Sequence, residues 1–141
     1  MAVAALVIGA VELIATIGVV IALVVATRAI APLPSDVPTP QDVTARRLVV
    51  GNCVAELPPD GDVDTVRVVP CADKHAALVG GSTRLTDDTW PGQTAVDREV
   101  AATCVLTDSQ RTAGASLRAW SPTEQGWQVG DRTGLCFVVG G

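Results

Sequence analysis

The sequence predicts an α+β protein with a single N-terminal transmembrane helix, a proline-rich stalk and a small disulfide-stabilised domain, in which a curled antiparallel sheet packs on one helix. Three observations lead to this fold class: an apolar run at residues 2–27, prolines clustered in residues 30–43, and four cysteines among valine-rich segments in the remainder. The predicted boundaries are residues 1–28 for the anchor, 29–43 for the linker and 44–141 for an extracytoplasmic domain.

The apolar run from Ala2 to Thr27 is long enough to cross a bilayer. As a helix it would extend roughly 39 Å at about 1.5 Å per residue, whereas the hydrocarbon core is about 30 Å thick. A buried core helix would carry a polar face, yet the only ionisable side chain here is Glu12. A cleaved secretory signal would begin with basic residues and have a shorter apolar core. The run is therefore predicted to be a single-pass anchor in the plasma membrane.

One face of this helix carries small residues at intervals of three and four, at Ala15, Gly18, Ala22 and Ala26. Small side chains let helices approach closely in a membrane, so this stripe is predicted to contact the helices of a larger complex. General abundance of alanine explains the stripe equally well, and both interpretations stay open. Glu12 is predicted to make an interhelical hydrogen bond or ion pair, because an unpaired carboxylate is costly in a bilayer.

Two signals conflict over the orientation of the anchor. Arg28, Arg46 and Arg47 follow the helix, and the positive-inside tendency would place the domain in the cytoplasm. The four cysteines instead indicate an oxidising compartment. Because only Arg28 is close to the helix, the cysteines decide the prediction that the C-terminal domain lies on the outer, periplasmic side.

Residues 30–43 contain a dense group of prolines, at Pro32, Pro34, Pro38 and Pro40. Proline cannot continue a helix and favours the extended polyproline conformation, which rises about 3.1 Å per residue. A semi-rigid stalk between the anchor and the domain is therefore expected.

The first half of the domain is predicted to be strands. Residues 48–54 and 63–71 are rich in valine and partly alternate between apolar and polar side chains, and residues 57–61 between them favour a turn. These two segments are predicted to pair as a hairpin. Residues 76–85 form a third predicted strand, interrupted by a Gly-Gly pair where a bulge is expected.

The single helix of the domain is predicted over residues 94–107. Thr94 and Asp97 have the spacing of a capping box, with Asp in place of Glu. Apolar side chains recur at helical intervals, at Val96, Val100, Ala101 and Cys104. Short strands are predicted to close the chain, at residues 117–120, 127–129 and 135–139.

The four cysteines predict two disulfide bonds. If the first two strands pair, Cys53 and Cys71 can face each other across the hairpin, which leaves Cys104 on the helix for Cys136 on the last strand. Each bridge would contribute about 2–4 kcal/mol to the stability of a domain with few aromatic side chains.

No constellation in the sequence supports a catalytic residue, a cofactor or a metal ion. Cys71 and His75 lie four residues apart but lack a second close pair of zinc ligands. Asp60, Asp62 and Asp64 imitate the start of a calcium loop without its glycine or its terminal glutamate. Phosphate loops and nucleophile elbows are absent, and the formal net charge of −5 gives no reason to expect nucleic acid as a partner.

Four motifs between residues 50 and 138 occur together: Gly-Asn-Cys ending at Cys53, Pro-Cys-x-x-x-His ending at His75, Trp-Pro-Gly starting at Trp90, and Trp-x-x-Gly-Asp-Arg-x-x-x-Cys starting at Trp127. This pattern resembles the actinobacterial septum formation domain family. The resemblance implies a disulfide-stabilised extracytoplasmic domain without established catalytic residues. It also implies structural roles for the motif residues His75, Trp90, Trp127, Asp131 and Arg132, with Asp131 and Arg132 ordering the final turn and Trp127 packing beneath it.

The order of anchor, stalk and domain resembles the small single-pass accessory subunit of the actinobacterial cytochrome c oxidase, part of the cytochrome bcc-aa3 respiratory supercomplex. This resemblance implies a non-catalytic role in assembly, stability or docking, with integral membrane subunits and the lipid bilayer as partners. The alternative is a free-standing cell-envelope protein whose domain binds a cell-division or wall-synthesis partner. A sensor of a small ligand or metal built around His75 is a third, weaker possibility.

Overall fold

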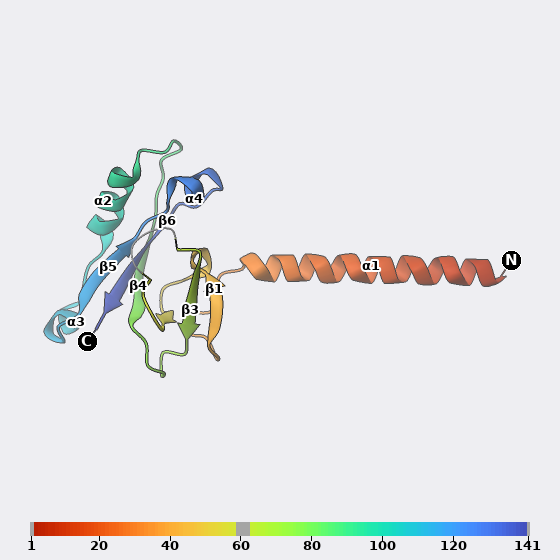
Figure 1. Ribbon diagram of the computed structural model, residues 1–141, viewed down its shortest axis with the longest axis horizontal. Helices are drawn as coiled ribbons and strands as arrows, with labels where there is room; N and C mark the ends of the chain where they lie inside the picture. Colours follow the sequence, from red (N-terminus) through yellow and green to blue (C-terminus); the bar gives the residue numbers. More distant parts are fainter. Residues whose placement is uncertain (1, 59–62, 141) are drawn as a thin grey trace. The chain divides into compact units, whose positions relative to one another are not determined.

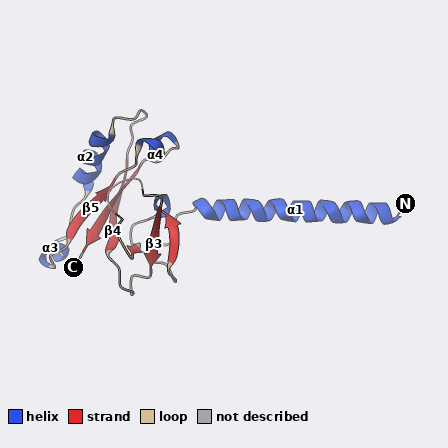
Figure 2. Cartoon of the chain, in the orientation of Figure 1, coloured by secondary structure: helices blue, strands red, loops and turns tan. Residues whose placement is uncertain are grey.

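The computed structural model describes residues 2–58 and 63–140 (Figure 1). The chain divides into two compact units, Met1–Ala31 and Pro32–Gly141, and each is considered by itself. The first unit is a single helix, α1 (Ala2–Ile30). The second is a mixed domain of strands and short helices (Figure 2).

The structure corrects the predicted membrane anchor. In the part of the chain that the structure describes, no helix is both long and apolar enough to cross a membrane. The predicted single transmembrane helix, the plasma membrane localisation and the outer-side placement of the domain are therefore not supported.

The predicted proline-rich stalk is also wrong, because this segment belongs to the domain. Leu33 and Val37 are buried, with exposed fractions of 7% and 2%, and both pack in the main hydrophobic core. The next residues form a strand, β1 (Gln41–Thr44), which pairs with a strand more than twenty residues later. The prolines do not prevent Leu33 and Val37 from entering the core. The free energy gained by burying these two side chains outweighs the preference of the segment for a solvent-exposed, extended conformation.

Six strands form one antiparallel sheet in the order β1-β3-β2-β4-β6-β5. Besides β1, they are β2 (Cys53–Val54), β3 (Thr65–Val69), β4 (Ala77–Arg84), β5 (Ser116–Trp120) and β6 (Thr133–Val139). β2 pairs with β3, as the predicted hairpin requires, but it is only two residues long. The register of β4 against β6 shifts between Val79 and Gly81, which confirms the bulge expected at the Gly-Gly pair.

The described domain holds three short α-helices rather than the single predicted one. They are α2 (Gln93–Thr103), α3 (Asp108–Thr112) and α4 (Glu124–Gln128), and a 3₁₀ turn, η1 (Ala45–Arg47), follows β1. Thr107 and Gln110 complete a capping box on α3, while Thr123 accepts a hydrogen bond from the Gly126 N–H and caps α4. The predicted strand at residues 127–129 is therefore wrong, because this cap starts a helix there.

Two hydrophobic clusters lie on opposite faces of the sheet. Val79 and Phe137 are paired across β4 and β6, and both are fully buried in the larger cluster. The smaller cluster centres on Val96 and Val100 of α2, which packs against β5 and β6. Alternation of side chains along a strand explains why one sheet supplies both cores.

Candidate functional site

The Cys53–Cys71 disulfide is present as predicted, with a Cα–Cα distance of 5.2 Å. Cys53 lies in β2 opposite Val69, the last residue of β3, and Cys71 follows two residues later. The side chain of Cys53 is buried, with 1% exposed, whereas Cys71 is partly exposed. The bridge therefore joins the end of one strand to a surface turn.

The second predicted bridge, Cys104–Cys136, is also confirmed, with a Cα–Cα distance of 5.4 Å. Cys104 directly follows α2 as its C-cap residue, and Cys136 is in the middle of β6. This bridge holds α2 on the sheet at the edge of the smaller cluster.

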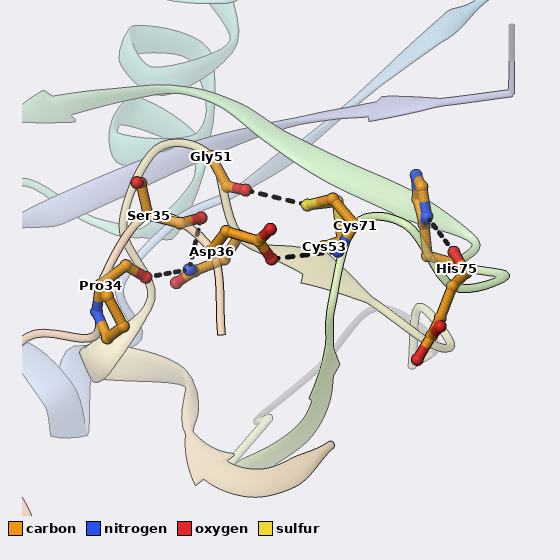
Figure 3. The surroundings of a disulfide bond; sticks show 9 residues. Pro34, Ser35, Asp36, Gly51, Cys53, Cys71 and His75 are labelled. Atoms are coloured by element: carbon orange, nitrogen blue, oxygen red, sulfur yellow. Dashed lines mark hydrogen bonds between the residues drawn. A yellow bond between two sulfur atoms is a disulfide. The ribbon is translucent and has the colours of Figure 1, made fainter. Parts of the chain in front are cut away.

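Asn52 organises the segment that follows α1, which we call the strap (residues 32–37). Its Nδ2 donates to the carbonyl oxygens of Pro34 and Ser35 at 2.7 and 3.0 Å (Figure 3). Its Oδ1 accepts from the Val49 N–H at 3.0 Å. Asn52 is completely buried and all three bonds are intramolecular, so it fixes the strap on the domain.

A second contact ties the strap to the other half of the disulfide. The carboxylate of Asp36 accepts a hydrogen bond from the Cys71 N–H at 3.0 Å (Figure 3). The Sγ of Cys71 lies 3.2 Å from the carbonyl oxygen of Gly51, and because a disulfide sulfur carries no hydrogen, this is a close sulfur–oxygen contact. Asn52, next to Cys53, and the backbone N–H of Cys71 therefore both bind the strap.

His75 lies beyond this cluster and is exposed. Its Nδ1 is 2.8 Å from the Asp73 carbonyl oxygen (Figure 3). Since a carbonyl only accepts, Nδ1 is the donor in this contact. Cys71 cannot act as a zinc ligand or a nucleophile beside His75 while it is in a disulfide. Among the described residues no group of three or more His, Cys, Asp or Glu side chains could hold a metal.

The aromatic motif residues gather around Trp127 of α4, which is 4% exposed. The Arg132 guanidinium lies 3.7 Å from the centre of the Trp127 ring and donates to the Trp127 carbonyl oxygen at 2.7 Å. Trp90 meets the Trp127 ring edge-on at 5.2 Å. The Asp131 carboxylate accepts from the Thr133 N–H at 3.1 Å and orders the turn into β6. These contacts fit the structural roles expected for the motif.

A shallow hollow of about 420 Å³ lies beside His75. It is lined by Leu78 and Val138, which pair across β4 and β6, by Ser109 of α3, and by Ala113, the residue after α3.

The stripe residues of α1, Ala15, Gly18, Ala22 and Ala26, are exposed, as is Glu12. A Cβ atom added at Gly18 would meet no other heavy atom within 4 Å. The predicted contacts of this helix stay predictions. The acidic segment that imitates the start of a calcium loop includes Asp60 and Asp62, and these two residues lie outside the described residues.

The residues that sequence reasoning missed are Asn52, Asp36 and Arg46. Arg46 in η1 forms an ion pair with Asp131 at 3.7 Å, and so links the start of the domain to its last turn. The sequence did offer one sign of Asn52. It is a polar residue between a glycine and a cysteine in a valine-rich segment, and asparagine is uncommon in strands. Nothing local pointed to Asp36 or Arg46, because their partners are distant in the sequence.

Comparisons with known protein families, curated proteins and solved structures found no match to this chain. The two family resemblances of the sequence therefore stay predictions.

Proposed function

We propose that this protein is a non-catalytic accessory subunit of the actinobacterial cytochrome bcc-aa3 oxidase supercomplex, with the domain of the septum formation type. In this role α1 packs against apolar helices of the larger subunits, and the domain assists assembly, stability or docking. The proposal requires no cofactor or catalytic residue in this chain.

The observation that carries the proposal is the apolar surface of α1. Nine large apolar side chains between residues 13 and 25 are 44–70% exposed, on all sides of the helix. Water-exposed apolar surface on this scale is unfavourable and marks a contact with another apolar surface. Helices of a larger assembly supply such a surface along the whole length of α1.

The small-residue stripe supports the same partner. Ala15, Gly18 and Ala22 allow close approach of a second helix, and the absence of any neighbour around Gly18 leaves room for it. The carboxylate of Glu12 needs a donor or cation from the partner once water is excluded.

Purification of the tagged full chain from an actinobacterial host in mild detergent tests the proposal. We expect haem absorbance to co-elute with the wild-type protein. Gly18→Leu should reduce the haem recovered per mole by at least about tenfold, because the larger side chain blocks close approach of a helix. Val24→Leu is the matched control, since Val24 lies nine residues and two and a half turns after Ala15, on the opposite side of the helix.

Wild-type protein that elutes without haem contradicts the proposal. Equal loss of haem in Gly18→Leu and Val24→Leu contradicts the role of the stripe but leaves the assembly itself supported.

A free-standing envelope protein that binds a cell-division or wall-synthesis partner is the second candidate. The hollow beside His75 favours it, because it is open at the domain surface and the partly exposed Leu78 lines it. Under this alternative the same purification recovers division or wall-synthesis proteins without haem, and Ala113→Arg, which fills the hollow, abolishes their recovery while Gly18→Leu does not.

A further inference from the structure

β5 (Ser116–Trp120) is an edge strand, because the strand order of the sheet ends β4-β6-β5 (Figure 1). Its main contacts are with β6, its neighbour in the sheet, and with α2. α2 covers a face of the sheet, since a Cβ added at Gly134 of β6 would run into the Val100 side chain of α2. In the described part of the chain, no strand pairs with the outer edge of β5.

The hydrogen bonds of Val79 in β4 show which backbone groups of β5 point outward. In an antiparallel ladder, the N–H and C=O of one residue point to the same side, and successive residues alternate. The Val79 N–H donates to the Asn52 carbonyl oxygen at 2.8 Å, and its own carbonyl accepts from the Gly51 N–H at 2.9 Å. Both groups therefore point away from Phe137, the partner of Val79 in β6. Phe137 accordingly directs its N–H and C=O toward β5, where it is opposite Arg118.

The residues on either side of Arg118 point the other way. Because Arg118 forms the hydrogen-bonded pair with Phe137, the N–H and C=O groups of Leu117 and Ala119 point away from β6. The Ser116 Oγ lies 3.4 Å from the carbonyl oxygen of its partner in β6, residue 139, which agrees with this alternation. Among the described residues, no hydrogen bond outside the ladder involves Leu117 or Ala119. Two backbone donors and two acceptors are therefore left at the edge.

We propose that the outer edge of β5 binds an extended segment of another protein, which adds to the sheet as a further antiparallel strand. An extended backbone supplies acceptors and donors at alternate residues, as Leu117 and Ala119 require. Arg118 then lies opposite the middle residue of the segment in a non-hydrogen-bonded pair, in which the side chains are close. Since Arg118 is exposed, an acidic side chain is favoured at that position of the segment.

A second copy of this chain fits the edge less well. In the symmetric antiparallel arrangement, Leu117 of each copy bonds to Ala119 of the other, and the two Arg118 side chains face each other. Like charges directly opposite each other destabilise a pair of strands. The occupant is therefore a segment of a different protein. The residues of this edge all belong to the domain, so the proposal does not rest on the function proposed for α1.

Amide hydrogen exchange of the full chain in mild detergent, with and without the capped peptide Thr-Val-Glu-Val-Thr, tests the proposal. This peptide places valine opposite Leu117 and Ala119, and glutamate opposite Arg118. We expect the Leu117 and Ala119 amides to exchange at least about tenfold more slowly with the peptide, while the Arg118 amide, already bonded to β6, stays within about threefold. Equal protection of all three amides, or no protection at peptide concentrations up to about 5 mM, overturns the proposal.

Charge reversal tests the acidic character of the bound segment by NMR titration. The wild type should bind Thr-Val-Glu-Val-Thr about two- to fivefold more tightly than Thr-Val-Lys-Val-Thr, and Arg118→Glu should reverse this preference. Arg84→Glu is the matched control, because it makes the same change of charge on β4, which β6 separates from the edge. A preference that Arg118→Glu leaves unchanged, or that Arg84→Glu reverses equally, overturns the proposal. Protection of Leu117 and Ala119 that appears without peptide as the chain dimerises also overturns it, in favour of a second copy.

Discussion

Gly134 in β6 lies directly beneath α2, and its substitution by alanine should destabilise the domain. A Cβ at this position would lie 2.6 Å from Cγ1 of Val100, closer still to its Cγ2, and 3.1 Å from Cγ2 of Thr83. Favourable carbon–carbon contacts begin at about 3.5 Å. Val100 is completely buried, and as a β-branched residue in a helix it has essentially one rotamer, so it cannot move aside.

The expected cost of Gly134→Ala is about 1–3 kcal/mol, the usual cost of overpacking a well-filled core. For a domain of this size that corresponds to a fall in Tm of roughly 5–15 °C. Val100→Ala removes two methyl groups and should cost about 2 kcal/mol by itself. In the double variant the new methyl group occupies the space that Val100 leaves, so the combined cost should be below the sum by about 1 kcal/mol or more.

Thermal and urea unfolding of the full chain, followed by tryptophan fluorescence, measures all three variants, and buried Trp127 belongs to the same cluster. Gly81→Ala is the matched control, because its Cβ would lie 3.6 Å from Cβ of Cys136, an ordinary contact, and should change stability by less than about 1 kcal/mol. Neutral behaviour of Gly134→Ala, or strict additivity with Val100→Ala, would refute this account of the packing between α2 and β6.

Three further substitutions probe the start of the domain, each by urea unfolding. Gly51→Ala should cost about 1–3 kcal/mol, because Gly51 has φ +100° and a Cβ there would lie 2.9 Å from Cβ of Ser35; a neutral result would show that the strap does not pack closely here. Asn52→Ala leaves the carbonyl oxygens of the strap and one N–H without their bonds and should cost about 1–3 kcal/mol; a loss below about 0.5 kcal/mol would contradict its role. Arg46→Ala should cost less than about 1 kcal/mol, because its ion pair with Asp131 is half exposed on the arginine side; a larger loss would mean that this pair anchors η1.

The local elements of the domain were largely readable from the sequence. The strands at β3, β4, β5 and β6 follow valine-rich or alternating segments, and α2 follows helical spacing of apolar residues. The errors arose where two local signals competed. At Trp127 the short apolar segment suggested a strand, but the Thr123 cap begins a helix instead.

Proline content misled the prediction for residues 30–43 because it describes backbone preference and not burial. Leu33 and Val37 lie among polar and proline residues, and the segment that carries them is bound by hydrogen bonds that Asn52 and Cys71 donate. These partners are 17–35 residues away in the sequence, which no local pattern reports. For the same reason the sequence predicted only part of the site around the disulfide. It identified the cysteines but not the residues that bind the strap.

By itself, the sequence determined the pairing of the four cysteines, because once the first two strands pair, only one partner is left for Cys104. It also determined the helical character of the apolar N-terminal run, which depends on composition alone. Only the tertiary structure decided that the strap joins the core and that Gly134 must be small beneath α2. These features depend on the distance between side chains far apart in the sequence, and that distance exists only once the sheet has formed.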